Sequence, residues 1–178
     1  MSETTFVPGA PQFGRYTLPE AEAAAAVVDA RQVLETVADL DDRRAALEAT
    51  IDLANALTTA RREAEAVELL APVVAAARAD DVPLDALGWA LLMLATAEQY
   101  LGRADAATAG FAEALEIARQ RGDDELQHYV LHHAARHLVD QGDVDGARSM
   151  FADALSIRVR LGDPRAAQTQ AALSALSG

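Results

Sequence analysis

The stretch Gly102–Asp163 carries the same pattern twice, and this repetition decides the fold. The first copy begins at Gly102 and reads GRADAA, FAEALEI and GD, separated by short segments. The second copy begins 40 residues later, at Gly142, and reads GDVDGA, FADALSI and GD at the same spacing. Self-similarity at a fixed period of about 20 to 50 residues is typical of repeat proteins, whose units bury their apolar faces by stacking on one another. The sequence therefore predicts a row of stacked repeats.

Composition predicts a single all-α domain. Of the 178 residues, 51% are hydrophobic and only 4% are aromatic. The chain is rich in Ala and Leu, the residues that lose least free energy on entering a helix, and it has almost no β-branched runs. Its length suits one ordinary domain with a continuous core.

Charge and residue usage exclude several classes of partner and chemistry. The net charge of −13 and the pI near 4.6 repel nucleic acids and anionic membranes, so we expect neither as a partner. The absence of Cys excludes disulfides and thiolate metal sites. No signal peptide or apolar span is apparent, which predicts a cytoplasmic protein. All 15 basic residues are Arg, which suggests a bacterial source with a high-GC genome.

Turn residues divide the chain into about eight predicted helices. Short Gly-Asp or Asp-Pro punctuation separates amphipathic segments, and connections this short force neighbouring helices to lie antiparallel. Asp pairs between helices are interpreted as helix caps, not as catalytic carboxylates. The expected organisation is an extended arm over residues 1–17 and one repeat domain over 18–178, with repeats at 43–81, 83–122 and 123–162 and flanking helices at 18–38 and 163–177.

The predicted arm holds three of the chain's few aromatic residues: Phe6, Phe13 and Tyr16. Pro and Gly recur too often for a helix, so residues 1–17 are either a loose tail or an arm docked on the helices. Both interpretations stay open.

An apolar stripe runs along the second helix of each predicted hairpin. Its members fall at helical spacing, and the Phe at its centre is expected to fill the space between adjacent hairpins. The stripe consists of Ala107, Phe111, Ala114, Leu115 and Ala118 in one copy, and of Ala147, Phe151, Ala154, Leu155 and Arg158 in the next.

This pattern resembles the tetratricopeptide repeat (TPR), whose signature includes an Ala-x3-Phe step after a first helix carrying Leu and a small residue. A weaker copy, with Ala66 and Leu70, precedes by 41 residues. The resemblance implies a right-handed superhelix of antiparallel helical hairpins. The period of 40 is longer than the common form, and such longer variants are similar to sensor regions of bacterial regulators and to kinesin light-chain arrays.

In the TPR family, the first helix of each hairpin lines a concave groove that holds a peptide. Asn55 matches an asparagine that often bonds the backbone of the peptide, and Thr96 and Arg136 replace it in the other repeats. Trp89 and Tyr129 occupy equivalent places, and they either anchor a partner or pack against a neighbouring helix or the arm. The partner-binding groove residues that the resemblance implies are Asn55, Trp89, Leu92, Thr96, Gln99, Tyr129, His132 and Arg136.

All four histidines lie in one predicted helix, at positions 128, 132, 133 and 137. Their spacing allows a metal site, but no second helix supplies a further ligand, so we predict no metal. They are interpreted as a polar groove wall that gains charge as the pH falls through about 6.5. No nucleophile motif or phosphate-binding loop is present, so no enzyme activity and no cofactor are expected.

These observations predict a non-enzymatic adaptor that binds a peptide or protein segment in its concave groove. One alternative is a structural repeat protein that self-associates, with its own arm docked in the groove. Another is a metal-binding protein that uses the His-rich helix. A homo-oligomer is compatible with each hypothesis.

Overall fold

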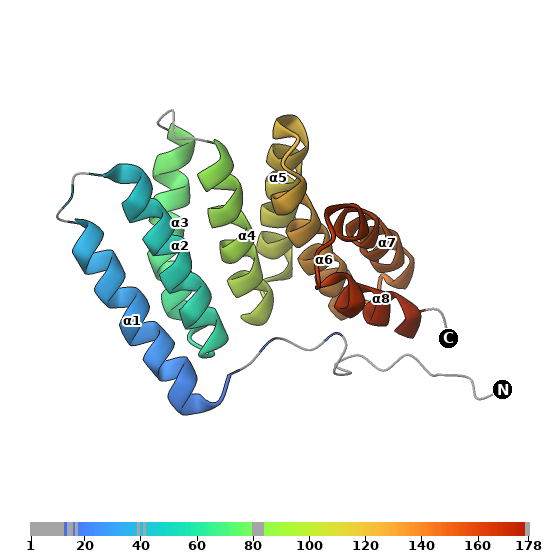
Figure 1. Cartoon of the computed structure of the whole chain (residues 1–178), viewed down its shortest axis with the longest axis horizontal. Coiled ribbons are helices and arrows are strands. Elements are labelled where there is room, and N and C mark those ends of the chain that lie inside the picture. Colours follow the sequence, from blue (N-terminus) through green and yellow to red (C-terminus); the bar gives the residue numbers. More distant parts are fainter. Residues whose placement is uncertain are drawn as a thin grey trace. The chain divides into compact units, whose positions relative to one another are not determined.

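The computed structural model describes residues 13, 16, 18–38, 40, 42–79 and 84–176, with side chains in the last range from residue 86. Over these residues the chain forms eight helices and no strand, which confirms the all-α prediction (Figure 1). Predictions that concern Phe6, and those for the arm other than at residues 13 and 16, lie outside the described residues. The helices are α1 Glu20–Ala38, α2 Arg43–Thr59, α3 Glu63–Ala79, α4 Leu84–Tyr100, α5 Ala104–Arg121, α6 Asp124–Gln141, α7 Val144–Leu161 and α8 Ala166–Ala175.

One type of turn recurs between these helices. The residue after the helix adopts a left-handed conformation, with a φ of 62° to 80° at four glycines. At Gly142 the backbone N–H donates to Val139 O, and the next N–H donates to Leu138 O, which together satisfy two terminal carbonyls. The same pair of bonds forms at Gly102, Gly122 and Gly162.

Asp side chains begin several of the helices, as the sequence predicts. Asp42 accepts hydrogen bonds from two backbone N–H groups of α2, each at 3.0 Å. Asp123 and Asp143 each accept one, at 2.9 Å, from the first turns of α6 and α7. Before the last helix, Asp163 accepts hydrogen bonds from the backbone N–H and the side chain of Arg165, and α8 starts at Ala166.

The helices group into two compact units, which are described separately. The N-terminal unit is Tyr16–Ile117, in which α1 packs on α2, α2 on α3 and α4, and α3 on α4 (Figure 1). Helix α5 approaches α4 closely at Gly110, where a Cβ would lie 2.9 Å from the Ala95 Cβ. The prediction of one continuous repeat domain stays a prediction.

The C-terminal unit comprises the chain from Ala118 onward together with Phe13. Helix α6 packs on α7, and α7 packs on α8. Its core cluster consists of Phe13, Ala135, Val139, Ala147, Phe151, Ala172 and Leu176.

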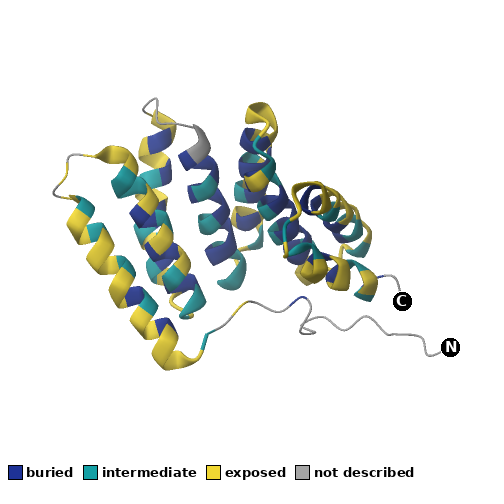
Figure 2. Cartoon of the chain, viewed as in Figure 1, coloured by how far each residue is buried: buried dark blue, intermediate teal, exposed yellow. Residues whose placement is uncertain are grey.

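Figure 2 shows buried residues on one face of helices such as α1 and α7, as helical periodicity requires, whereas α4 and α6 have few exposed residues in their described parts. The predicted second-helix stripe is confirmed as core except at Leu155, which is half-buried. Phe111 and Phe151 are 3% and 0% exposed, and the Ala residues of the stripe are fully buried. Arg158, the one charged member, is also buried.

Candidate functional site

Helices α2 and α4 of the N-terminal unit carry five of the eight predicted groove residues. Asn55 is exposed, and Trp89 and Gln99 are half-buried, so all three present surface. Leu92 is fully buried in the core, and Thr96 is buried with its hydroxyl donating to Leu92 O at 2.8 Å. Within this unit, the predicted groove residues that a partner could reach are therefore Asn55, Trp89 and Gln99.

The other three predicted residues lie on α6. The half-buried Tyr129 ring stacks on His128, with centroids 4.8 Å apart, and the Arg165 guanidinium carbon lies 4.3 Å from its ring centre. His132 and Arg136 are buried, at 3% and 7% exposure. Each of the three is thus engaged by groups of its own unit.

A buried arginine joins α6, α7 and α8. Arg158 of α7 is 2% exposed, and its Nε donates to His128 Nδ1 at 3.2 Å. Its Nη1 donates to the Thr169 hydroxyl and to Arg165 O, and it lies 3.3 Å from His132 Nδ1. A buried guanidinium requires such partners, because burial of an unpaired charge is costly.

His128 connects Arg158 with an acid. Since His128 accepts a hydrogen bond at Nδ1, its proton is assigned to Nε2. That Nε2 lies 3.3 Å from Asp163 Oδ2, which also accepts a hydrogen bond from Arg165 at 2.6 Å. The order Arg158, neutral His128, Asp163 therefore places a negative charge one imidazole away from the buried cation. We call Arg158, His128, His132, Asp163, Arg165 and Thr169 the Arg158 cluster.

The cluster keeps its histidines neutral, which corrects the prediction that the His-rich helix gains charge near pH 6.5. Burial, and secondarily the neighbouring His133, lowers the pKa of His132 from 6.5 to about 2. Burial and the Arg158 charge also lower the pKa of His128. His137 is only 2% exposed, so three of the four histidines are core residues and do not line an open polar wall.

No described His, Asp or Glu side chains gather in threes in a way that could hold a metal ion. The histidine spacing on α6 is explained by the Arg158 cluster, in which His128 and His132 serve as acceptors and as close neighbours of a cation. The His-rich helix therefore gains no support as a metal site.

Arg136 binds the N-terminal segment. Its Nε donates to the backbone carbonyl of Phe13 at 3.0 Å, across 123 residues of sequence. The Phe13 side chain is 5% exposed, and its ring centre lies 6.3 Å from that of Phe151. Phe13 is thus a core residue of the C-terminal unit. At this residue the structure agrees with the alternative in which the arm is docked on the helices.

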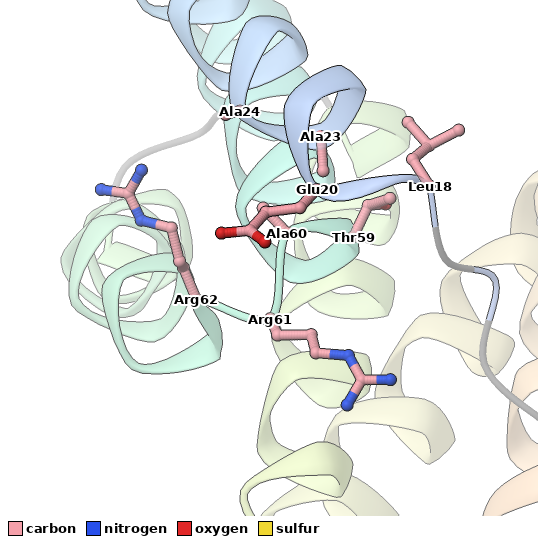
Figure 3. Close-up of a pocket in the computed structure, with 8 residues that line it drawn as sticks. All are labelled: Leu18, Glu20, Ala23, Ala24, Thr59, Ala60, Arg61 and Arg62. Carbon is pink, nitrogen blue, oxygen red and sulfur yellow. The ribbon is translucent and has the colours of Figure 1, made fainter.

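A separate cavity of 490 Å³ lies at the α2–α3 turn of the N-terminal unit. It is bordered by the start of α1 and by Arg61 and Arg62, whose side chains point in different directions (Figure 3). Arg62 is already paired with Glu65 at 2.6 Å, and Glu20 adds a negative charge to the lining. This cavity contains none of the predicted groove residues.

Sequence reasoning missed most of the Arg158 cluster. One signal was present, because Arg158 stands where the preceding repeat has Ala118, in a stripe otherwise made of core residues. A charge at a core position of a repeat predicts buried partners on the facing helices. The two histidines one turn apart on α6 were the matching half of that signal.

Comparison with solved structures supports the TPR-like helical repeat fold. A Podosopora anserina protein assigned as a kinesin light chain, with nearly identical TPR-like repeats, is 22% identical. Its two crystal structures have TM-scores of 0.66 and 0.65, over 88% of this chain and 77% and 78% of theirs.

BtubC (BKLC) from P. vanneervenii is also 22% identical, with a TM-score of 0.67 over 88% of this chain. This chain spans 63% of the length of that structure. No known protein family and no curated protein sequence matches the chain. The similarity to these solved structures shows that the fold is that of a TPR-like repeat protein. No helix in the described part of the chain is both long and apolar enough to cross a membrane.

Proposed function

We propose that this protein is a non-enzymatic, cytoplasmic interaction module that binds a protein or peptide segment along the first helices of its hairpins. The observation that carries the proposal is the hydrogen bond from Arg136 to the Phe13 carbonyl. Arg136 holds the backbone of a segment distant in sequence, which is the task that the TPR resemblance assigns to this position. The TPR-like fold of the solved neighbours supports an interaction role.

The accessible part of the proposed surface suits a partner with apolar and polar groups. Trp89 of the N-terminal unit is half-buried, and Asn55 is exposed. Trp is among the residue types that most often dominate binding energy, and Asn can both donate to and accept from a peptide backbone. We assign recognition to these two residues in the N-terminal unit and to Tyr129 and Arg136 in the C-terminal unit.

Capture of partners from a lysate of the source organism tests this function. Trp89→Ala and Arg136→Glu should each reduce the captured partner at least tenfold, whereas Arg160→Glu, an exposed change outside the proposed surface, should not. A thermal melt of each variant separates lost binding from lost folding. Undiminished capture by both folded variants would sink the proposal.

Self-association is the second candidate, and the burial of Phe13 favours it because an arm that docks in cis can also dock on a second copy. Sedimentation of the full chain and of a chain lacking residues 1–17 tests it. A mass that is the same at all concentrations, and unchanged by the truncation, would exclude this candidate.

A further inference from the structure

We call the core cluster around Phe13, apart from Phe13 itself, the seat of Phe13, and it includes small residues of three different helices. Ala135 of α6, Ala147 of α7 and Ala172 of α8 are each 0% exposed and share one cluster with Phe13. Phe151 closes the cluster on one side, with its ring tilted by 33° to that of Phe13. Phe13 is the one member of this cluster that comes from before α6 in the sequence, and it adds an aromatic ring to a core otherwise supplied by the C-terminal helices and Leu176.

A polar contact fixes the backbone beside this seat. Arg136 is 7% exposed, and its Nε donates to the Phe13 carbonyl at 3.0 Å. Two features therefore hold Phe13: an apolar cluster packs around its ring, and the Arg136 guanidinium binds its backbone carbonyl. Any segment that contains a Phe can satisfy both features, because every residue has a backbone carbonyl.

We propose that this seat is a binding site for an aromatic residue in a segment of a partner protein, and that Phe13 is the chain's own competitor for it. Phe13 covers the site in cis, and a partner segment carrying a Phe, with its carbonyl bound by Arg136, displaces it. The inference rests on the proposed function and specifies the chemistry that the partner must have at the C-terminal unit.

The probe is a fluorescein-labelled peptide with the sequence of residues 5–17, titrated by anisotropy into the full-length chain. Phe13→Ala vacates the seat, so this variant should bind the peptide at least tenfold more tightly than the wild-type chain does. A peptide carrying Phe13→Ala should bind neither chain. Arg136→Gln, introduced into the Phe13→Ala chain, should weaken the peptide by several-fold without abolishing binding.

A graded variant protects the test against a folding defect. Phe13→Leu fills part of the seat, and its affinity for the peptide should lie between those of the wild-type and Phe13→Ala chains. Equal affinity of all three chains, or equal binding of the peptide that lacks Phe13, would overturn the inference. A wild-type dimer that dissociates on addition of peptide would also overturn it and assign the seat to the arm of a second copy.

This outcome is separable from that of the proposed function. If the peptide fails to bind while Trp89→Ala still reduces partner capture, the seat of Phe13 is purely structural and the interaction role stands. If the peptide binds as expected while capture is unaffected by Trp89→Ala and Arg136→Glu, the interaction role fails.

Discussion

At the scale of single residues, Arg158 is the least expected feature of the protein. Its guanidinium is 2% exposed and is held by groups from α6 and α8. Buried charges of this kind add little stability relative to an apolar residue of the same shape, but they make the structure depend on each partner. The geometry of the C-terminal unit is therefore sensitive to a residue that simple core patterns would place as Ala.

Replacing Arg158 by Ala should be strongly destabilising. The substitution leaves the buried acceptor His128 Nδ1 without its donor, and it leaves a cavity, so we expect a loss of about 3–5 kcal/mol in the free energy of unfolding. Urea denaturation measures it. The matched control is Arg160→Ala, two residues away, whose exposed ion pair with Asp124 is screened by water, so its loss should change the free energy of unfolding far less. Equal small effects for both would refute the role of the cluster.

The stability of the protein should fall in mild acid. The pKa of His132 is about 2 in the folded chain and 6.5 when unperturbed, so the unfolded chain binds a proton below pH 6.5 that the folded chain does not. Stability is therefore complete above pH 6.5 and decreases as the pH falls, by about 1.4 kcal/mol per pH unit for each such histidine.

Urea titrations between about pH 8 and pH 5 measure this dependence. His132→Asn can keep a hydrogen bond but cannot titrate, so its slope should be smaller by about one proton. A wild-type free energy of unfolding that is constant over this range would contradict the neutral state assigned to His132.

At the scale of elements, five of the described turns share one left-handed form, and one of the five has a residue other than Gly at its left-handed position. Four turns place Gly in the left-handed conformation, but the α2–α3 turn places Arg61 there, with a φ of 60°. The same hydrogen bonds form, from Arg61 N to Thr58 O at 3.2 Å and from Arg62 N to Leu57 O at 2.9 Å. The sequence of this turn is therefore less suited to its conformation than the sequences of the other four.

Arg61→Gly should stabilise the protein. A left-handed conformation costs a non-glycine residue about 1–2 kcal/mol, and part of the gain is offset by the greater freedom of Gly in the unfolded chain. We expect a net gain of about 0.5–1 kcal/mol, measured as a higher midpoint in urea. The reverse substitution, Gly102→Arg, is the control and should lower the midpoint. A Cβ at residue 102 meets nothing within 4 Å, so the cost is confined to the backbone. A lower midpoint for Arg61→Gly would show that the Arg61 side chain stabilises the turn.

Helices and caps could be predicted because their signals are local. A Gly or Asp at a helix end acts on its own backbone, as Asp42 and Gly142 do, and the repeat fixes which face of each helix is buried. The partners of Arg158 and Phe13 could not be predicted in the same way. Each contact joins residues distant in sequence, and nothing in the local pattern of Phe13 names Arg136, 123 residues away. The groove prediction was limited for the same reason, since the accessibility of Asn55 and Leu92 depends on neighbouring helices.

At the scale of the whole molecule, Phe13 should affect one unit and spare the other. Its core cluster and its hydrogen bond with Arg136 belong to the C-terminal unit. Phe13→Ala should therefore speed amide hydrogen exchange in these three helices, while exchange in α2 and α3 stays as in the wild-type chain. Exchange read by mass spectrometry on peptic fragments measures both regions at once. A uniform increase across all helices would contradict this assignment.

The contact between Phe13 and Arg136 also constrains the order in which parts of the protein can fold during synthesis. Residue 13 leaves the ribosome well before α6, α7 and α8, because α6 begins more than 100 residues later in the sequence. Helices of the N-terminal unit can pair soon after they emerge, since their contacts are between near neighbours in sequence. The cluster around Phe13 must instead wait until α6, α7 and α8 have been synthesised and then incorporate a residue made more than 100 positions earlier. Until then Phe13 has no core to enter, so the early part of the chain carries an aromatic side chain whose burial depends on helices that are still to be synthesised.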